Sequence, residues 1–306
     1  MENAEDHVNM SGCHLCPRSC GVDRKQGAVG FCGVSWELMA ARAALHYWEE
    51  PCISGKSGSG AVFFSGCGLR CVFCQNYEIA HARAGRIITV ARLAEIFLEL
   101  QQKGANNINL VTATHYVPQV SEAIRLARQN GLTLPFVYNT ASYEYPETIL
   151  RISDQISVWL PDYKYDDPAL ALRYSGAEDY PETARKAIAQ MVQSAGKPEF
   201  DPESGLITSG VIVRHLILPG HTEDSKRAIR YLYETYGNEI YLSIMNQYTP
   251  MPGIAQRAPE LARKLTRREY EKVLDYALNL GVENAFIQEG RTAKESFIPA
   301  FDNEGV

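Results

Sequence analysis

From about residue 60 onwards the sequence alternates between short apolar runs, rich in β-branched and aromatic residues, and longer stretches of helical periodicity. The predicted strands are 61–66, 107–111, 134–139, 156–161, 211–218 and 241–245, with a last apolar run at 285–288. Helices are predicted over 89–104, 120–131, 146–152, 167–195, 223–236 and 266–280. Repeated strand–helix units form a parallel sheet covered by helices, which predicts an α/β protein. A doubly wound sheet and a partial or full (β/α) barrel both fit this pattern.

Composition and charge exclude several classes of protein. The chain has 306 residues, 45% of them hydrophobic and 22% charged, which is enough for one large core or two domains. A net charge of −6 argues against a nucleic-acid-binding protein, which normally has a basic surface. The sequence lacks the run of about 18 apolar residues that a membrane helix needs, and its acidic, polar start does not resemble a signal peptide. We therefore expect a cytoplasmic protein with no membrane partner.

Eight cysteines all fall in the first quarter of the chain, which favours metal binding over disulfides in a reducing compartment. Cys67, Cys71 and Cys74 lie on one predicted loop directly after the first strand, within SGCGLRCVFCQNYE. Three thiolates can bind three irons of a [4Fe–4S] cluster and leave the fourth iron open for a ligand. A zinc site completed by His81 or another cysteine, or a set of buried free thiols, also fits this spacing.

The spacing C-x3-C-x2-C, with Phe73 just before the third cysteine, resembles the signature of the radical S-adenosylmethionine (SAM) superfamily. The stretches FFSGCGLRCVFCQNYEI, NINLVTATHYVPQV, VYNTASYE, WLPDYKY, VIVRHLILPG and MNQYTP extend this resemblance over nearly the whole chain. The activating enzyme of pyruvate formate-lyase acts on a glycyl-radical enzyme. Together these stretches are similar to a stand-alone family related to that activating enzyme.

The resemblance implies a partial (β/α)6-type barrel with a cysteine-rich N-terminal module. It divides the chain into 1–58, a metal-binding module and linker, and 59–306, the barrel with a C-terminal extension. The stretch 54–60, SGKSGSG, is expected to be a flexible linker. The implied cofactors are a [4Fe–4S] cluster on Cys67, Cys71 and Cys74, and SAM, which the reduced cluster cleaves to a 5′-deoxyadenosyl radical. A flavodoxin or ferredoxin is the implied electron donor.

The same resemblance implies a SAM pocket at the carboxyl ends of the strands. Many relatives carry Gly-Gly-Glu after the second strand, where this chain has Thr112 and Thr114, whose hydroxyls are expected to act instead. Asp162 and Lys164 resemble an Asp-Leu-Lys motif that lies against SAM in the activating enzymes, and they point to one side of a strand. The other expected pocket residues are Phe73, Asn139, Arg214 and Gln247.

Arg214 is a charge within an apolar strand, and a buried charge needs a partner. That partner is either the carboxylate of SAM or a carboxylate of the chain, such as Asp162 or a glutamate. His115, His215 and His221 also lie near strand ends, where a lone histidine is usually a hydrogen-bonded structural residue.

Cys13, Cys16, Cys20 and Cys32 form a second cysteine group that contains a C-x2-C pair. Four thiolates complete a tetrahedral site, so zinc, a single iron or an auxiliary iron–sulfur cluster all fit. Cys52 stands apart, either as a plain buried thiol or as a residue that faces the substrate.

Three functions remain open for this chain. The first is a radical SAM oxidoreductase that abstracts hydrogen from a small molecule or a peptide, and a protein substrate would need a more open barrel mouth. The second is an activating enzyme that installs a glycyl radical on a partner. The third is a non-catalytic iron–sulfur or metal-binding protein.

Overall fold

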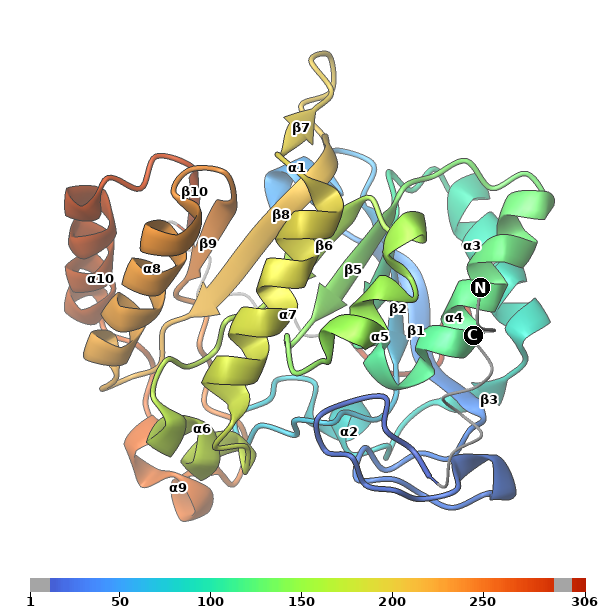
Figure 1. Cartoon of the computed structure of the whole chain (residues 1–306), viewed down its shortest axis with the longest axis horizontal. Helices are drawn as coiled ribbons and strands as arrows, with labels where there is room; N and C mark the ends of the chain where they lie inside the picture. The colour runs from blue at the N-terminus through green and yellow to red at the C-terminus, as the bar shows by residue number, and fades with distance from the viewer. Residues whose placement is uncertain (1–11, 289–298) are drawn as a thin grey trace.

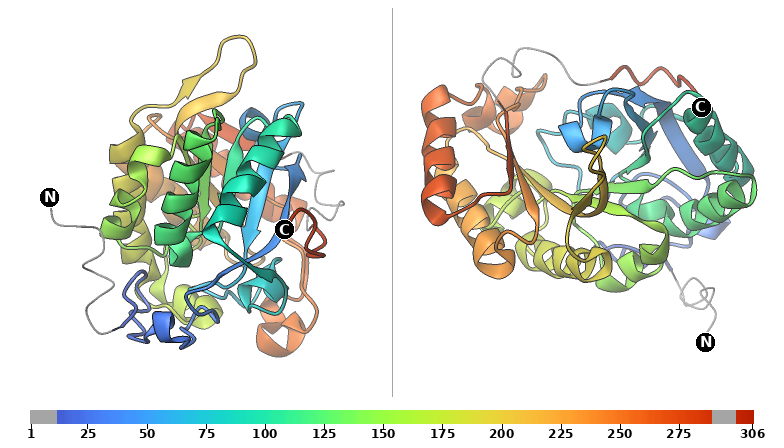
Figure 2. Two further views of the ribbon diagram at one scale, coloured as in Figure 1. Left: turned by 90° about the vertical axis from the view of Figure 1, so that its right-hand side faces the viewer. Right: turned by 90° about the horizontal axis from the view of Figure 1, so that it is seen from above.

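The computed structural model describes residues 12–288 and 299–306, which form a curved ten-stranded sheet with helices along its outer face (Figures 1 and 2). The strands are β1 (Leu38–His46), β2 (Ser59–Phe64), β3 (Arg86–Ile88), β4 (Ile108–Val111), β5 (Phe136–Thr140), β6 (Val158–Pro161), β7 (Glu199–Phe200), β8 (Ile207–Leu216), β9 (Tyr241–Met245) and β10 (Ala285–Ile287). Their order in the sheet is β10-β9-β8-β6-β5-β4-β2-β1-β3, with β7 beside β8.

The helices fall between the strands in chain order. They are α1 (Pro51–Ser54), α2 (Tyr77–Ala80), α3 (Val90–Gln102), α4 (Val117–Gln129), α5 (Pro146–Leu150), α6 (Pro168–Ser175), α7 (Tyr180–Ala195), α8 (Thr222–Tyr236), α9 (Ile254–Arg257) and α10 (Arg267–Leu280). Four short 3-10 helices are η1 (Arg24–Gln26), η2 (Thr114–Tyr116), η3 (Ser153–Gln155) and η4 (Pro259–Leu261).

The predicted parallel sheet is confirmed. Each predicted strand is present, and β2, β4, β5, β6, β8, β9 and β10 pair in parallel in that order. The sheet curves around a central space, so the α/β fold is a partial barrel rather than a doubly wound sheet (Figure 2, right). Parallel strands direct all their carboxyl ends to one rim, and in Figure 1 this rim is the lower one.

The helices pack through the apolar faces that the periodicity predicts. In α3 the Thr89 side chain accepts a hydrogen bond from the Arg92 backbone N–H at 3.0 Å and so caps the helix. Leu93, Phe97 and Leu100 of α3 are buried against the sheet. These contacts fix the strands, and with them the rim that carries the site.

Two antiparallel strands extend the sheet beyond β2, and hydrophobic periodicity did not predict them. β1 pairs antiparallel with both β2 and β3. The sequence of β1, LMAARAALH, is rich in alanine, which favours helix over strand, so its own residues gave no strand signal. The hydrogen bonds to β2 hold these residues in a strand, although their own preference is for a helix.

The proposed division of the chain at residues 58 and 59 stays a prediction.

The expectation of a flexible linker over 54–60 is wrong. Ser54 ends α1, and Ser59 and Gly60 begin β2, so only 55–58 lie between the two elements. Ser59 Oγ donates a hydrogen bond to Asn107 Oδ1 at 2.6 Å, and a Cβ on Gly60 would lie 2.9 Å from the Asn107 carbonyl oxygen. Small residues stand here because the backbone of β2 passes close to the residues around Asn107. The Gly/Ser composition of the stretch does not distinguish such close packing from a flexible linker.

Helix α1 closes the amino-terminal end of the barrel. Seen from above, α1 lies within the concave side of the sheet (Figure 2, right). Its Cys52 and Ile53 pack with Val137, Val158 and Ile212 of three neighbouring strands. The barrel interior is thereby open at the carboxyl-terminal rim and filled at the opposite end. No helix within the described ranges is long and apolar enough to cross a membrane.

We expect Ile53→Ala to lower the free energy of unfolding by about 2–5 kcal/mol, because Ile53 is fully buried and its truncation leaves a cavity under the barrel. Leu278→Ala is the control: Leu278 on α10 is 60% exposed, so its loss should change the free energy by less than about 0.5 kcal/mol. Urea unfolding followed by circular dichroism measures both. Equal losses of unfolding free energy in Ile53→Ala and Leu278→Ala would show that α1 does not fill the end of the barrel.

Candidate active site

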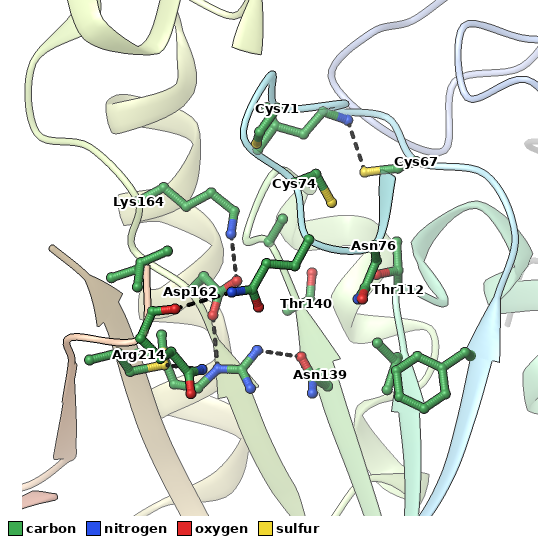
Figure 3. A pocket seen from close by; sticks show the side chains of 18 of the residues that line it. Cys67, Cys71, Cys74, Asn76, Thr112, Asn139, Thr140, Asp162, Lys164 and Arg214 are labelled. Carbon is green, nitrogen blue, oxygen red and sulfur yellow. Dashed lines mark hydrogen bonds and ion pairs between the residues drawn. The ribbon is translucent and has the colours of Figure 1, made fainter. Parts of the chain in front are cut away.

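The three-cysteine loop lies at the carboxyl-terminal rim, directly after β2, above a cavity of about 230 Å³ inside the barrel (Figure 3). Cys67, Cys71 and Cys74 all line this cavity. Cys71 is buried, while Cys67 and Cys74 are partly exposed. The three thiols therefore share one space that opens at the barrel mouth.

Two of the sulfurs accept hydrogen bonds from the protein. The Leu69 backbone N–H donates to Cys67 Sγ at 3.3 Å, and Ser175 Oγ donates to Cys71 Sγ at 3.0 Å. Burial raises the pKa of Cys74 to about 12, with the nearby Cys71 and Cys67 adding to the shift. Donors directed at sulfur stabilise thiolates that bind a metal or cluster. The loop thus has the donor set and the surrounding hydrogen bonds that fit a [4Fe–4S] cluster with three protein ligands.

A single metal ion has no such site here. Within residues 12–288 and 299–306, no group of three or more His, Cys, Asp or Glu side chains has the spacing to hold a metal ion. The thiolates of an iron–sulfur cluster bind different irons, so they surround the cluster rather than converge on one atom.

A continuous chain of buried charges forms the wall of the cavity opposite the loop. Lys164 Nζ donates to Asp162 Oδ2 at 2.6 Å, and Arg214 Nε donates to Asp162 Oδ1 at 2.8 Å. Asp162 comes directly after β6 and forms a parallel bridge with Arg214 of β8, so strand pairing sets this contact. Burial alone would raise the pKa of Asp162, but the charges of Arg214 and Lys164 outweigh it and hold that pKa below its usual value.

Glu49 also belongs to this network, and it was not among the predicted pocket residues. Arg214 Nη1 donates to Glu49 Oε2 at 3.1 Å, and the amides of Asn109 and Asn139 donate to Glu49 Oε1 at 3.0 and 3.2 Å. The Glu49 side chain is only 10% exposed, and burial raises its pKa against the opposing charge of Arg214. Arg214 thus has its carboxylate partners within the chain, which is the second of the two predicted alternatives.

Most of the predicted pocket residues line the same cavity. Those that line it are Phe73, Thr112, Asn139, Asp162, Lys164, Arg214 and Gln247. Asn139 Oδ1 accepts from Arg214 Nη2 at 2.6 Å, which places the end of β5 beside the charge network (Figure 3). Thr112 has a φ of 62°, a left-handed conformation rare for threonine, at the end of β4.

Thr114 lies elsewhere. It belongs to η2, interacts with Tyr138 and Glu144, and lines a separate space of about 20 Å³. That small space also touches Cys16 and Cys67, so it lies between the N-terminal cysteine group and the cysteine loop.

The N-terminal cysteine group lies beside the loop, at the same rim (Figure 1, dark blue). The Cys67 backbone N–H donates to the Cys32 carbonyl at 3.2 Å, and a Cβ on Gly68 would lie 3.4 Å from Cys16 Sγ. A Cβ on Gly30 would lie 3.3 Å from Cys20 Sγ and 3.4 Å from Cys32 Sγ, so these thiols face one glycine. Burial raises the pKa of Cys16 to about 12, and the charges of the other three thiols add to it.

The remaining candidates have structural partners. His115 Nε2 donates to Ser65 O at 2.8 Å, and His215 Nδ1 donates to Tyr163 O at 2.6 Å. His221 Nε2 forms a hydrogen bond of 2.8 Å with the Tyr174 hydroxyl. Cys52 is buried in the apolar group under the barrel, away from the cysteine loop.

Glu49 and Ser175 reach the site from elements that carry no motif. Glu49 follows an unpredicted strand, and Ser175 is the last residue of α6. The one sequence signal for Glu49 was that the buried charge of Arg214 required an acidic partner. No signal in the sequence distinguished Ser175 from the other serines.

Comparison with known proteins gives one family. Residues 61–232, more than half of the chain, match the profile of the Radical SAM superfamily. An uncharacterized protein of Methanocaldococcus jannaschii is 25% identical over 273 residues, which cover 87% of this chain and 74% of that protein. A 5-amino-6-(D-ribitylamino)uracil–L-tyrosine 4-hydroxyphenyl transferase of Nostoc punctiforme is 25% identical over 235 residues, covering 70% of this chain and 59% of the transferase.

Solved structures share the fold. Methylornithine synthase superposes with a TM-score of 0.50 at 14% identity, covering 72% of this chain and 60% of the synthase. The FeFe-hydrogenase maturase HydG of Carboxydothermus hydrogenoformans gives a TM-score of 0.51 at 11% identity, covering 74% of this chain and 53% of HydG. The chain thus spans less than two thirds of the length of both structures.

We expect Glu49→Ala to lower the free energy of unfolding by about 3–5 kcal/mol, because it removes one of the two carboxylates that pair with the buried Arg214. It also leaves Arg214 Nη1 and two asparagine amides without an acceptor. Glu49→Gln keeps oxygen acceptors and should cost less. Glu95→Ala is the matched control, since Glu95 is 63% exposed and pairs with Arg92 at 3.2 Å, a contact worth about 0–1 kcal/mol. Urea unfolding that gave equal losses for Glu49→Ala and Glu95→Ala would contradict the network's role.

Proposed function

Because the chain belongs to the radical SAM superfamily, we propose that it is an enzyme that binds a [4Fe–4S] cluster through Cys67, Cys71 and Cys74 and SAM in the adjoining cavity. When bound, the cluster supplies the electron that cleaves SAM reductively and so gives the hydrogen-abstracting chemistry of the superfamily. The observation that carries this assignment is the shared cavity, which joins the three thiols to the charge network of Asp162, Lys164 and Arg214 (Figure 3).

The charged residues of the cavity bind and orient SAM. Lys164 is held by Asp162, and its ammonium lies close enough to Cys71 and Cys74 to feel their charges, so it is placed for the carboxylate of SAM. Asp162 and the hydroxyl of Thr112 are placed for the ammonium group of SAM. Arg214 does not bind SAM directly in this proposal; it holds Asp162 in place through the bond from its Nε.

Burial of this network excludes water from the reacting groups. The side chains of Asp162, Arg214 and Glu49 are between 10% and 17% exposed, and Phe73 packs edge-on against Tyr165, Tyr174 and Tyr248. A dry cavity protects a reactive radical from side reactions and strengthens the electrostatic contacts within it.

We favour a small molecule or a peptide as the substrate. The cavity of about 230 Å³ is closed by α1 at the amino-terminal end of the barrel and is lined by Glu49 and His46. The N-terminal cysteine group flanks the loop at the mouth. These groups leave a pocket rather than a broad open rim. Hydrogen abstraction from such a substrate would make the enzyme an oxidoreductase.

The alternative is the activation of a glycyl-radical enzyme, which the motif Cys74-Gln75-Asn76 favours through its similarity to the pyruvate formate-lyase activating enzyme. A third candidate is a non-catalytic iron–sulfur protein, which would bind iron without binding SAM. The polar groups that line the cavity beside the cysteines argue for the enzyme.

We propose a flavodoxin or ferredoxin of the cytoplasm as the electron donor. Arg70, Arg83 and Arg257 all lie close enough to His81, beside the cysteine loop, to help lower its pKa, after the larger effect of burial. A basic surface next to the cluster steers an acidic protein toward it, and an acidic surface is what this proposal requires of the electron donor.

The residues 1–58 are proposed as a module in which Cys13, Cys16, Cys20 and Cys32 hold a second metal centre, either zinc or an auxiliary cluster. The proximity of Cys20 and Cys32 to Gly30 supports it, because a side chain at that position would meet both sulfurs. Four thiolates are a ligand set for either centre, and they would have to move closer together than they lie in the described residues to hold a single metal ion.

The central test is anaerobic. We expect the wild-type protein, reconstituted with iron and sulfide and given dithionite and SAM, to produce 5′-deoxyadenosine, and Cys71→Ala to lose at least about 100-fold of that yield because one iron loses its thiolate. Cys52→Ala is the matched control, since Cys52 lies under the barrel and should leave the yield unchanged. The ligand assignment would be overturned if the wild-type protein loads the cluster and binds SAM, and Cys71→Ala forms as much 5′-deoxyadenosine as the wild type.

A metal analysis tests the second centre. If it is zinc, Cys20→Ser should lose about one zinc per chain and keep about four irons. If it is an auxiliary cluster, the iron content should fall by about half. Identical zinc and iron contents in Cys20→Ser and wild type would contradict a metal centre on these four thiols.

A further inference from the structure

Arg18 lies behind the cysteine loop and joins three separate parts of the chain. Its guanidinium donates from Nε to Gly68 O at 2.7 Å, from Nη2 to Ser175 O at 2.7 Å and from Nη1 to Gly176 O at 2.5 Å. Its Cζ lies 4.1 Å from the centre of the Phe31 ring, as in a cation–π contact. The planar fork of arginine is fixed in orientation by such a set of acceptors, which a lysine could not reproduce.

Two of these acceptors belong to the carboxyl-terminal end of α6. Ser175 is the last residue of that helix, and Gly176 follows it in the left-handed conformation with a φ of 58°. A helix ends with carbonyl groups that lack partners within the helix, and a cation there is favourable. Arg18 supplies both the hydrogen bonds and the charge, so it anchors the end of α6.

The same end of α6 touches the cysteine loop. Ser175 Oγ donates to Cys71 Sγ at 3.0 Å, and the Val72 backbone N–H donates to Tyr174 O at 2.8 Å. The Tyr165 hydroxyl lies 2.8 Å from Ser175 Oγ and completes its environment. Two of the bonds of Arg18 hold the end of α6 that carries Ser175, and the third holds Gly68 within the cysteine loop. The Ser175 hydroxyl is the group at this end of α6 that bonds to the sulfur of Cys71.

We propose that Arg18 is a positioning residue that holds the Ser175 hydroxyl against Cys71 Sγ and thereby raises the reduction potential of the cluster. This inference rests on the proposed function, namely that Cys71 is a cluster ligand. A hydrogen bond to a ligand sulfur stabilises the extra negative charge of the reduced cluster, so it makes the cluster easier to reduce. Through Arg18 the N-terminal module therefore acts on the catalytic centre.

The test measures the midpoint potential of the reconstituted protein by redox titration with electron paramagnetic resonance detection. Arg18→Lys keeps the positive charge but loses the fork, and Ser175→Ala removes the donor. Both variants should have a more negative potential than wild type. The double variant should be no more negative than Ser175→Ala alone, because Arg18 acts through Ser175.

Two results would overturn this inference. An unchanged potential in Arg18→Lys means that Arg18 acts only through its charge or not at all. Additive shifts in the double variant mean that Arg18 does not act through Ser175. Arg173→Gln is the control, since Arg173 lies on the same helix but pairs with Glu260, and its potential should equal that of wild type.

A second readout needs no cluster, so it separates a failure of this inference from a failure of the proposed function. In the iron-free protein, the alkylation of Cys71 relative to the buried Cys52 should be slower in Arg18→Lys and Ser175→Ala, because the Cys71 thiolate loses the hydroxyl donor that stabilises it. An unchanged ratio overturns the positioning role. If the wild-type protein binds no cluster but both variants change the alkylation ratio relative to wild type, the proposed function is refuted and the positioning contact stands.

Discussion

The ion pair between Arg214 and Asp162 is the contact on which the rest of the site depends. It joins β8 to the end of β6, and each partner is bound again: Arg214 by Glu49 and Asn139, Asp162 by Lys164. A buried charge is costly unless it is paired and hydrogen-bonded, so the burial of this network requires all of its members together. It turns the rim of a partial barrel into a polar wall that faces the three thiols (Figure 3).

The fold supplies this geometry from both ends of the barrel. Parallel pairing brings the ends of β4, β5, β6 and β8 to one rim, and α1 fills the opposite end of the barrel. Glu49 lies shortly before α1 in the chain and bonds to Arg214 from inside the barrel. Residues before β2 support the site twice: Glu49 from inside the barrel, and Arg18 from behind the cysteine loop. The N-terminal residues are therefore part of the site and do not merely precede it.

The sequence predicted the parallel strands, the helices on their outer face and the gathering of most pocket residues, because hydrophobic periodicity and strand ends follow from local pattern. Thr114 was placed in the pocket on sequence position, but it turns away into η2 and lines a different space. β1 escaped prediction because its alanines form a strand only when β2 is beside them. Glu49, Arg18 and Ser175 act through contacts with residues far along the chain, which no local pattern encodes.

The most direct test of the central claim is an anaerobic calorimetric titration of SAM into cluster-loaded and cluster-free protein. If the three-thiol loop and the charge network form one binding site, SAM should bind at least about 10-fold more tightly to the loaded protein, a difference of about 1.4 kcal/mol. Equal affinity in the two forms, or no binding to fully loaded protein, would contradict the account of the cysteine loop and the cavity as a single active site.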